Sequence, residues 1–285
     1  MRYSTLLPTL LAIGSTLARP AQPEIANTTT LPTHFGLLTF PHFQALDIFG
    51  PMDLLNSLFM YYRNTSIVPQ FTVFSKTMDP VTSAMTDGGF GQEIMPAMTF
   101  SEYLVSCDRY MDMNKTDWTK NKQKDHGDDD IFSASDKGAI DVLIVPGGGG
   151  TRRDMTEEIN FVKATYPNLT TSPLKYIISV CTGATLLSRA GILDGRRATT
   201  NKAAWTWATS TGPNVDWVPT ARWVEDGNII STSGVSAGID GTYAFVSRVY
   251  GEEVAHFLSL ALEYNRETDA HHDPFGKVWD VPGAT

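Results

Sequence analysis

Cys181 lies where an apolar run ending at Val180 gives way to residues with helical spacing. The segment from Tyr176 to Gly191 predicts a buried strand, a sharp turn over Cys181 to Gly183, and then a helix. The first turn of a helix has unpaired backbone N–H groups and a partial positive charge, which favour a thiolate and can bind an oxyanion. Cys181 is therefore a candidate nucleophile, at a turn comparable to a serine nucleophile elbow. A cysteine that only fills space under the helix is the alternative.

A carboxylic acid, Asp47, follows another predicted strand, His34 to Phe40. The apolar residues around it have mostly helical spacing, and Gly50-Pro51 divides them, because proline suits the first turn of a helix. This pattern places Asp47 in the loop or short turn between the strand and the helix, where it is a candidate proton donor. Capping of the helix is the alternative role for an aspartate at this position.

Four consecutive glycines, Gly147 to Gly150, follow the predicted strand from Ala139 to Pro146. Such a run indicates backbone that passes close to other groups or adopts positive φ angles. The complete G-x-G-x-x-G spacing of dinucleotide-binding loops is absent. The backbone N–H of Gly148 is instead a candidate oxyanion donor, opposite the backbone N–H of Thr182.

Strand and helix patterns alternate along the chain, which predicts an α/β fold with a mostly parallel sheet covered on both faces. Sites in such sheets lie beyond the carboxyl ends of the strands, so Asp47, the glycine run and Cys181 should converge. The other predicted elements are a strand over Ile67 to Ser75, short strands with a hairpin within Val81 to Phe100, a helix over Asp154 to Tyr166, a helix around Trp205, two strands within Thr220 to Thr232 joined at Asp226-Gly227, and helices over Ser236 to Tyr250 and Glu252 to Arg266.

The composition indicates a protein that acts on small molecules. Of its 285 residues, 42% are hydrophobic, which is enough for a large core. The formal net charge of −9 and the lack of a basic stripe argue against nucleic acid as a partner.

The N-terminal part of the chain has the features of a secreted protein. Residues 1–18 combine the basic Arg2, an apolar stretch and small residues before Ala18, as a signal peptide requires. Residues 19–33 predict a disordered lead-in to a domain over residues 34–266. We expect a secreted or lumenal protein that does not associate with a membrane after the signal peptide is removed. Four N-x-S/T sequons make it a candidate glycoprotein, at Asn27, Asn64, Asn114 and Asn168.

Two further regions have no clear chemistry. Residues 106–138 alternate charges and predict a surface insertion, and residues 267–285 predict an extended tail. Cys107, at the edge of the insertion, could form a disulfide with Cys181, which would remove the nucleophile, and the sequence leaves this alternative open. Adjacent histidines in a polar tail are usually solvated, so no metal site is predicted at His271-His272-Asp273.

Four segments resemble the PfpI/ThiJ superfamily, which has a class I glutamine amidotransferase-like fold, and within it the isonitrile hydratase branch. They are FPHFQALDIFGPMDLL, DVLIVPGGGGTR, SVCTGATLLSRAGILDGRRATT and STSGVSAGID, and the likeness extends from His34 to Tyr264 apart from the insertion. It implies a flavodoxin-like three-layer α/β/α sandwich, a homodimer, and neither a metal nor an organic cofactor.

The resemblance also implies roles for particular residues. Cys181 matches the nucleophile of the family, Asp47 matches the acid that faces it, and Gly148 and Thr182 match the backbone donors. The protease-like and glyoxalase-like branches have a histidine after the nucleophile, where this chain has Thr182. Many relatives have another histidine where this chain has Asn201, so a Cys-His-acid triad is not expected.

The activity implied is hydration of an isonitrile, R–NC, to an N-substituted formamide. A Cys181 thiolate would attack the terminal carbon, and a protonated Asp47 would deliver the proton that the nitrogen needs. Thr182 could position the water that displaces sulfur. Two alternatives stay open: glyoxalase-like hydration of a small aldehyde such as methylglyoxal, and a non-catalytic domain that binds a ligand or senses oxidation.

Overall fold

A computed structural model of the chain describes residues 19–26, 31–63, 68–86, 88–106, 139–166 and 174–284. The predicted signal peptide, the four sequon asparagines, Cys107 and nearly all of the predicted insertion lie outside the described residues. Within the described part of the chain, no helix is long and apolar enough to cross a bilayer.

A seven-stranded sheet forms the centre of the described structure, in the order β10-β11-β7-β6-β1-β2-β5. All neighbouring pairs are parallel except β10 and β11, which form an antiparallel hairpin at one edge. The middle strands are continuous apolar runs because helices cover both faces of the sheet. The strands are β1 (His34–Leu38), β2 (Gln70–Ser75), β5 (Met98–Thr99), β6 (Val142–Val145), β7 (Tyr176–Ser179), β10 (Trp223–Asp226) and β11 (Ile229–Thr232).

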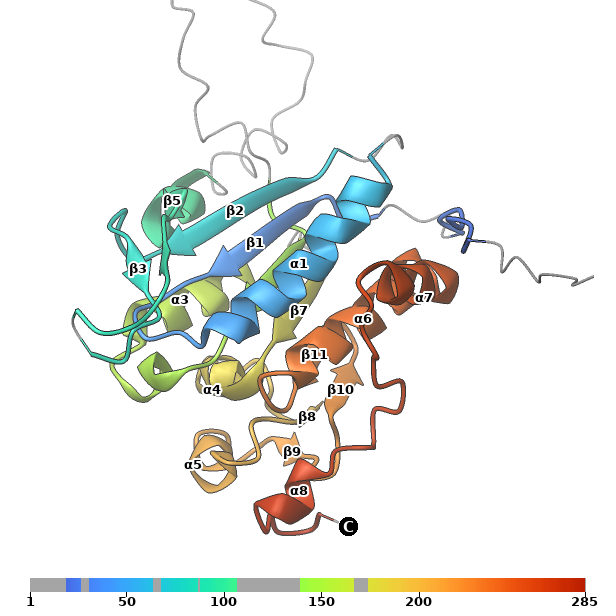
Figure 1. The fold of residues 1–285 in the computed structure, drawn as a ribbon. Coiled ribbons are helices and arrows are strands. Elements are labelled where there is room, and N and C mark those ends of the chain that lie inside the picture. The colour runs from blue at the N-terminus through green and yellow to red at the C-terminus, as the bar shows by residue number, and fades with distance from the viewer. Residues whose placement is uncertain are drawn as a thin grey trace, which may run out of the picture.

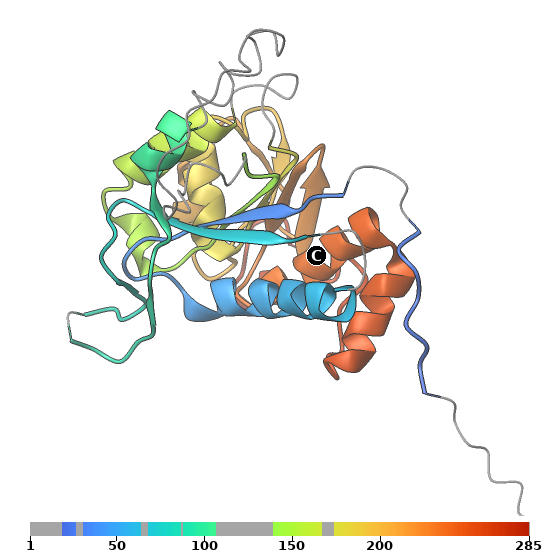
Figure 2. The same cartoon turned by 90° about the horizontal axis from the view of Figure 1, so that it is seen from above.

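Helices cover both faces of this sheet (Figure 1), and the view from above separates the three layers (Figure 2). On one face lie α1 (Ala45–Tyr61), α6 (Ala237–Tyr250) and α7 (Glu252–Ala261), and on the other lie α3 (Thr156–Thr165) and α4 (Ala184–Arg189). The predicted three-layer α/β/α fold is confirmed.

Smaller elements surround the sandwich. The hairpin predicted after the second strand is present as β3 (Val81–Thr82) and β4 (Glu93–Ile94). Near the carboxyl ends of the middle strands lie β8 (Arg197–Ala198), β9 (Asp216–Trp217), α5 (Trp205–Ser210) and α8 (Phe275–Val278). The 3-10 turns η2 (Gly149–Arg152) and η3 (Cys181–Gly183) follow β6 and β7.

The prediction that Gly50-Pro51 divides the first helix is wrong. Helix α1 runs without interruption through Pro51, and Asp47 lies in its first turn rather than in a loop. Pro51 removes only the hydrogen bond to the Asp47 carbonyl, and the buried leucines further along α1 hold the helix in place. Gly50 has no side chain, which leaves room for Ile239 of α6.

The two ends of the domain are also more structured than predicted. Within the lead-in, the Tyr62 hydroxyl donates to the Pro23 carbonyl (2.8 Å), and Gln22 donates to the Tyr61 carbonyl (3.0 Å). The apolar Ile25 packs against the core, which explains why this part of the segment is ordered. The tail includes the short helix α8, and Asp273 within it is buried.

The contact between α6 and β11 gives a prediction about stability. A methyl group at Gly241 would lie 2.3 Å from Thr232 Cγ2, so Gly241→Ala should destabilise the protein by about 1–3 kcal/mol. Adding Thr232→Ser removes that methyl group but keeps a hydroxyl for the Ser179 carbonyl, and should restore most of the loss. Urea denaturation measures both.

Gly234→Ala is the matched control, because no described heavy atom lies within 4 Å of the added methyl. An equal loss of stability in Gly241→Ala and Gly234→Ala, or no recovery with Thr232→Ser, would contradict this account of the packing.

Candidate active site

The carboxyl ends of three neighbouring strands, β1, β6 and β7, bring the predicted site residues together. The Gly147 N–H, after β6, donates to Asp47 Oδ2 at 2.8 Å. The Gly148 N–H donates to Thr182 Oγ1, after β7, at 3.0 Å. The predicted convergence of Asp47, the glycine run and the Cys181 turn is therefore confirmed.

Cys181 lies at a sharp corner between β7 and α4. Its φ angle is +57°, whereas Val180 before it is extended. A non-glycine residue in this left-handed region is strained, and such strain is often found at functional positions. The Cys181 side chain is a free thiol with 5% of the residue exposed.

The helix start was expected to favour a thiolate at Cys181, whereas the surroundings of the thiol act in the opposite direction. Burial raises the pKa of the Cys181 thiol, and the negative charge of Asp47 raises it further. The Thr182 N–H, the Asn201 side chain and the Thr182 side chain act in the opposite direction but do not compensate. Burial and the neighbouring carboxyl therefore favour the neutral thiol over the thiolate.

Asp47 is completely buried, and burial raises its pKa from 3.8 to about 7. The Gly147 N–H and the Cys181 thiol lower this pKa, but by less than burial raises it. Among the described residues, Oδ1 has no hydrogen-bond partner of normal geometry, although the weakly donating thiol is close enough to affect the pKa. Asp47 can therefore exchange a proton near neutral pH through Oδ1.

The glycine run allows this close approach. A Cβ at Gly147 would lie 2.5 Å from Thr182 N and 3.0 Å from Asp47 Oδ2, so a side chain would push the two groups apart. Gly148 has a φ angle of +126° and forms an isolated antiparallel bridge with Phe43. The Gly148 N–H is already hydrogen-bonded to Thr182 Oγ1, so its role as an oxyanion donor stays a prediction that requires this bond to open.

The Thr182 hydroxyl is the centre of a small polar cluster. It accepts the Gly148 N–H, and Thr151 Oγ1 lies 3.0 Å from it. It also acts as a hydrogen-bond partner of the Cys181 sulfur. Its predicted role in positioning water is untested, but its oxygen lies between the glycine run and the thiol.

Asn201 is a site residue whose role the sequence did not reveal. Its side chain hydrogen-bonds the Cys181 sulfur and lowers the pKa of the thiol. Its Oδ1 accepts the Ala204 N–H at 2.9 Å, which leaves the amide nitrogen as the donor to sulfur. In the sequence, Asn201 indicated only the loss of a possible base. Its position where relatives have a histidine was the available signal, since both side chains can donate to sulfur.

No cluster of three or more potential metal ligands occurs in the described part of the chain. In the tail, His272 Nδ1 lies 2.6 Å from Glu267 Oε2, whereas Asp273 points inward and accepts the Ser233 hydroxyl.

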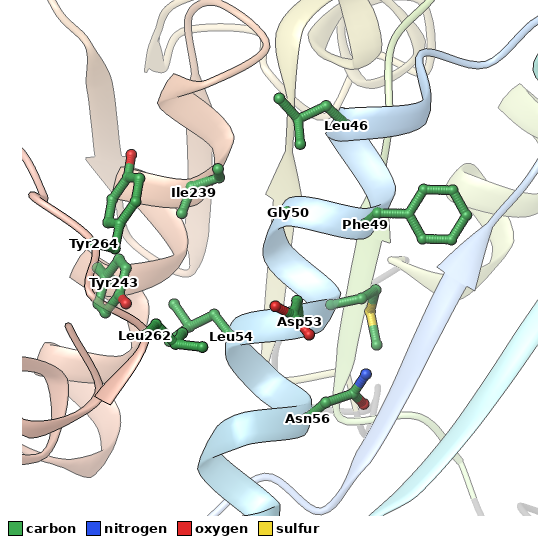
Figure 3. Close-up of a pocket in the computed structure, with 11 residues that line it drawn as sticks. Leu46, Phe49, Gly50, Asp53, Leu54, Asn56, Ile239, Tyr243, Leu262 and Tyr264 are labelled. Carbon is green, nitrogen blue, oxygen red and sulfur yellow. The ribbon is translucent and has the colours of Figure 1, made fainter. Parts of the chain in front are cut away.

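A groove of about 430 Å³ runs between α1 and α6, on the outer side of the helix that carries Asp47 (Figure 3). Leu46 and Phe49 of α1 are both about two-fifths exposed there. Tyr243 and Tyr264 form the opposite wall, with their rings stacked 5.5 Å apart. Helix α1 thus places a carboxyl at the site and apolar side chains at the surface.

The fold and site define an α/β protein with a cysteine elbow facing a buried carboxyl. Residues 96–248 match the DJ-1/PfpI family, and the chain belongs to this family. An isonitrile hydratase of Pseudomonas putida is 30% identical over 234 residues, which cover 80% of this chain and 77% of that enzyme. The predicted superfamily is confirmed.

Two other similarities either cover less of this chain or have a lower sequence identity to it. The HTH-type transcriptional regulator GbdR of Pseudomonas aeruginosa is 30% identical over 129 residues, 45% of this chain and 34% of the regulator. The crystal structure of a ThiJ/PfpI family protein from Pseudomonas syringae superposes with a TM-score of 0.56 at 22% identity, covering 89% of this chain and 84% of that one. This structure supports the fold alone.

The raised pKa of Asp47 gives a prediction about stability and pH. An unfolded aspartate ionises near pH 3.8, whereas folded Asp47 holds its proton up to about pH 7. Between these values Asp47 lowers the free energy of unfolding by up to about 1.4 kcal/mol per pH unit as the pH rises. Asp47→Asn should therefore be more stable than the parent protein at pH 8, with a gain that shrinks towards pH 4.

Urea denaturation at pH 4, 6 and 8 measures this effect. Asp53→Asn makes the same change at an exposed position of α1 and should alter stability little at any of these values. A variant Asp47→Asn that is less stable than the parent at pH 8 would show that the buried carboxylate is not a cost to folding.

Proposed function

We propose that this protein adds water to an isonitrile, R–NC, to give an N-substituted formamide, with Cys181 as the nucleophile. The observation that carries the proposal is the buried thiol of Cys181 beside a carboxyl, Asp47, whose pKa is about 7. The relative named isonitrile hydratase aligns over most of both chains and supports the same activity.

The pKa values favour a neutral thiol with an ionised Asp47 as the reactive pair. As sulfur bonds to the isonitrile carbon, Asp47 Oδ1 accepts the thiol proton and returns it to that carbon. The product is a thioimidate, R–N=CH–S, attached to Cys181. Water then adds to the same carbon while nitrogen gains a proton. The carbon–sulfur bond breaks, the sulfur recovers a proton, and the formamide R–NH–CHO is released.

The neighbouring polar groups support these steps. Asn201 donates to sulfur and stabilises the negative charge that develops as the thiol loses its proton. The Thr182 hydroxyl is close enough to sulfur to hold the attacking water on the thioimidate carbon. The Thr182 N–H and, once released from Thr182 Oγ1, the Gly148 N–H can stabilise negative charge on the substrate.

A non-catalytic ligand-binding domain is the second candidate function. The match to a transcriptional regulator over 45% of this chain favours it, because related domains occur in proteins named as regulators. Glyoxalase-like hydration of a small aldehyde has weaker support, because Thr182 stands where that branch has a histidine.

The proposed hydration predicts the effect of two substitutions on turnover. Cys181→Ala should abolish formation of formamide from an aryl isocyanide, because the covalent intermediate cannot form. Asp47→Asn should lower kcat about 10²-fold to 10⁴-fold, because no group then relays the proton. Formation of the formamide is followed by chromatography, and Asp53→Asn is the control with parental activity. Turnover by Cys181→Ala, or binding without turnover by the parent protein, would favour the non-catalytic domain.

The pH dependence of kcat/KM shows whether Asp47 acts first as a base or as an acid. If Asp47 acts first as a base, kcat/KM should rise as the pH passes about 7. A fall over the same range would instead indicate a protonated Asp47 facing a thiolate.

We also propose that the mature protein is a secreted, glycosylated homodimer. The signal-like residues 1–18 and the four sequons support the secretory route. The exposed Leu46 and Phe49 of the α1–α6 groove offer apolar surface to a second copy.

Expression in a eukaryotic host tests whether the protein is secreted, glycosylated and dimeric. The medium should contain a chain that begins near Arg19 and loses mass when N-glycans are removed enzymatically. Light scattering of the deglycosylated protein should give twice the mass of one chain. A cytosolic protein that retains Met1 would contradict the proposal.

A further inference from the structure

Lys202 is a buried lysine next to the segment that contacts the thiol. Only 3% of the residue is exposed, and its ammonium group donates to Thr199 Oγ1 (2.7 Å) and to the Ala221 carbonyl (2.9 Å). Its Nζ lies 3.8 Å from Asp273 Oδ2, and both side chains are almost completely hidden from solvent. A buried cation of this kind depends on its partner, because hydration no longer stabilises the charge.

The partner carboxyl comes from the C-terminal tail. Asp273 Oδ2 also accepts the Ser233 hydroxyl (2.5 Å), and Oδ1 accepts the Phe275 N–H (3.2 Å) at the start of α8. The Ala270 carbonyl accepts the Arg222 N–H (2.7 Å), which holds the tail beside β10. The tail therefore inserts one carboxyl into the protein, directly against Lys202.

The same segment, residues 199–202, contacts the active site through its two middle residues. The Thr200 hydroxyl donates to the Cys181 carbonyl at 3.0 Å. The Asn201 side chain hydrogen-bonds the Cys181 sulfur. Four consecutive residues thus connect the elbow to the tail. Thr200 and Asn201 contact Cys181, and Lys202 contacts Asp273 of the tail.

We propose that Asp273 is a positioning residue, which acts through Lys202 to hold Asn201 against the Cys181 sulfur, so that the C-terminal tail sets the reactivity of the thiol. The proposal rests on the proposed function only for the role of Cys181 as nucleophile. The contacts and the reactivity of the thiol can be measured without any substrate.

The electrostatics of Lys202 explain why losing the Lys202–Asp273 pair would disturb the segment that contacts the thiol. Burial lowers the pKa of Lys202 to about 8, whereas the charge of Asp273 raises it and so favours the ammonium form. Without that charge the ammonium keeps only its two hydrogen bonds and the face of the Trp205 ring, whose centroid is 4.7 Å from Nζ, so the amine loses its proton or moves towards water more readily. Either change weakens its bonds to Thr199 and to the Ala221 carbonyl, and Asn201, the preceding residue in the chain, is the one that contacts the thiol.

Alkylation of Cys181 by iodoacetamide tests the proposal, because the rate at a given pH follows the fraction of thiolate. A Cys107→Ser background leaves Cys181 as the only cysteine. Asp273→Asn should slow alkylation at pH 7, where Lys202 is still mostly protonated in the parent, about threefold to tenfold, the value of one ordinary hydrogen bond, and move the pH profile upwards. Asn201→Ala should slow it by at least as much.

The double variant shows whether Asp273 acts through Asn201. Asp273→Asn should have no further effect in an Asn201→Ala background, because the contact that it positions is already gone. Additive effects, an unchanged rate in Asp273→Asn, or faster alkylation would each overturn the proposal. Faster alkylation would mean that the tail shields the thiol from solvent.

Asp240→Asn is the matched control for a nonspecific loosening of the C-terminal tail. Asp240 is also buried, pairs with Arg222 at 2.7 Å, and holds the tail through the Glu267 N–H, but it does not contact Lys202. Because it weakens the tail without removing the partner of Lys202, it should shift the alkylation profile less than Asp273→Asn does, and an equal shift would overturn the proposal. If Asp273→Asn does not fold, Lys202→Gln breaks the pair without leaving a buried cation and is judged by the same outcomes. These measurements stay valid if isonitriles prove not to be substrates.

Discussion

A carboxyl and a thiol share one buried space in this protein, and neither can take a negative charge there easily. Burial raises the pKa of both Asp47 and Cys181, and the charge of Asp47 raises that of the thiol further. The groups that reduce this penalty are neutral donors: the backbone N–H groups of Gly147 and Thr182 and the side chain of Asn201. The rest of the site can be understood as the means of bringing these donors close enough.

The sheet brings most of these donors close to Asp47 and Cys181. Strands β1, β6 and β7 are neighbours, so the segments that follow them leave the sheet at the same edge and within hydrogen-bond distance of one another. Backbone donors work only if no side chain separates the segments, which explains the glycine at position 147. The buried middle strands hold this edge in place, and the site depends on them for its geometry.

Local patterns predicted the elements well, whereas the properties of the site depend on distant residues. The elbow at Cys181 follows from one apolar run and one helical repeat, and alternation along the chain predicted the layered fold. The sequence did not predict that α1 continues through Pro51, because the effect of proline on a helix depends on tertiary packing, which the buried leucines of α1 provide. The thiol was expected to be anionic because a helix start is visible in the sequence, whereas burial and the distant Asp47 are not. The role of Asn201 was missed for the same reason, since it lies twenty positions after Cys181 in the sequence.

The anchored lead-in has a consequence for proteolysis at the start of the domain. Gln22 and Pro23 are hydrogen-bonded to residues at the end of α1. Aminopeptidases need a free, extended end, so trimming should stop at this attachment. The first strand, and with it the start of the helix that carries Asp47, is thereby protected from trimming by exopeptidases.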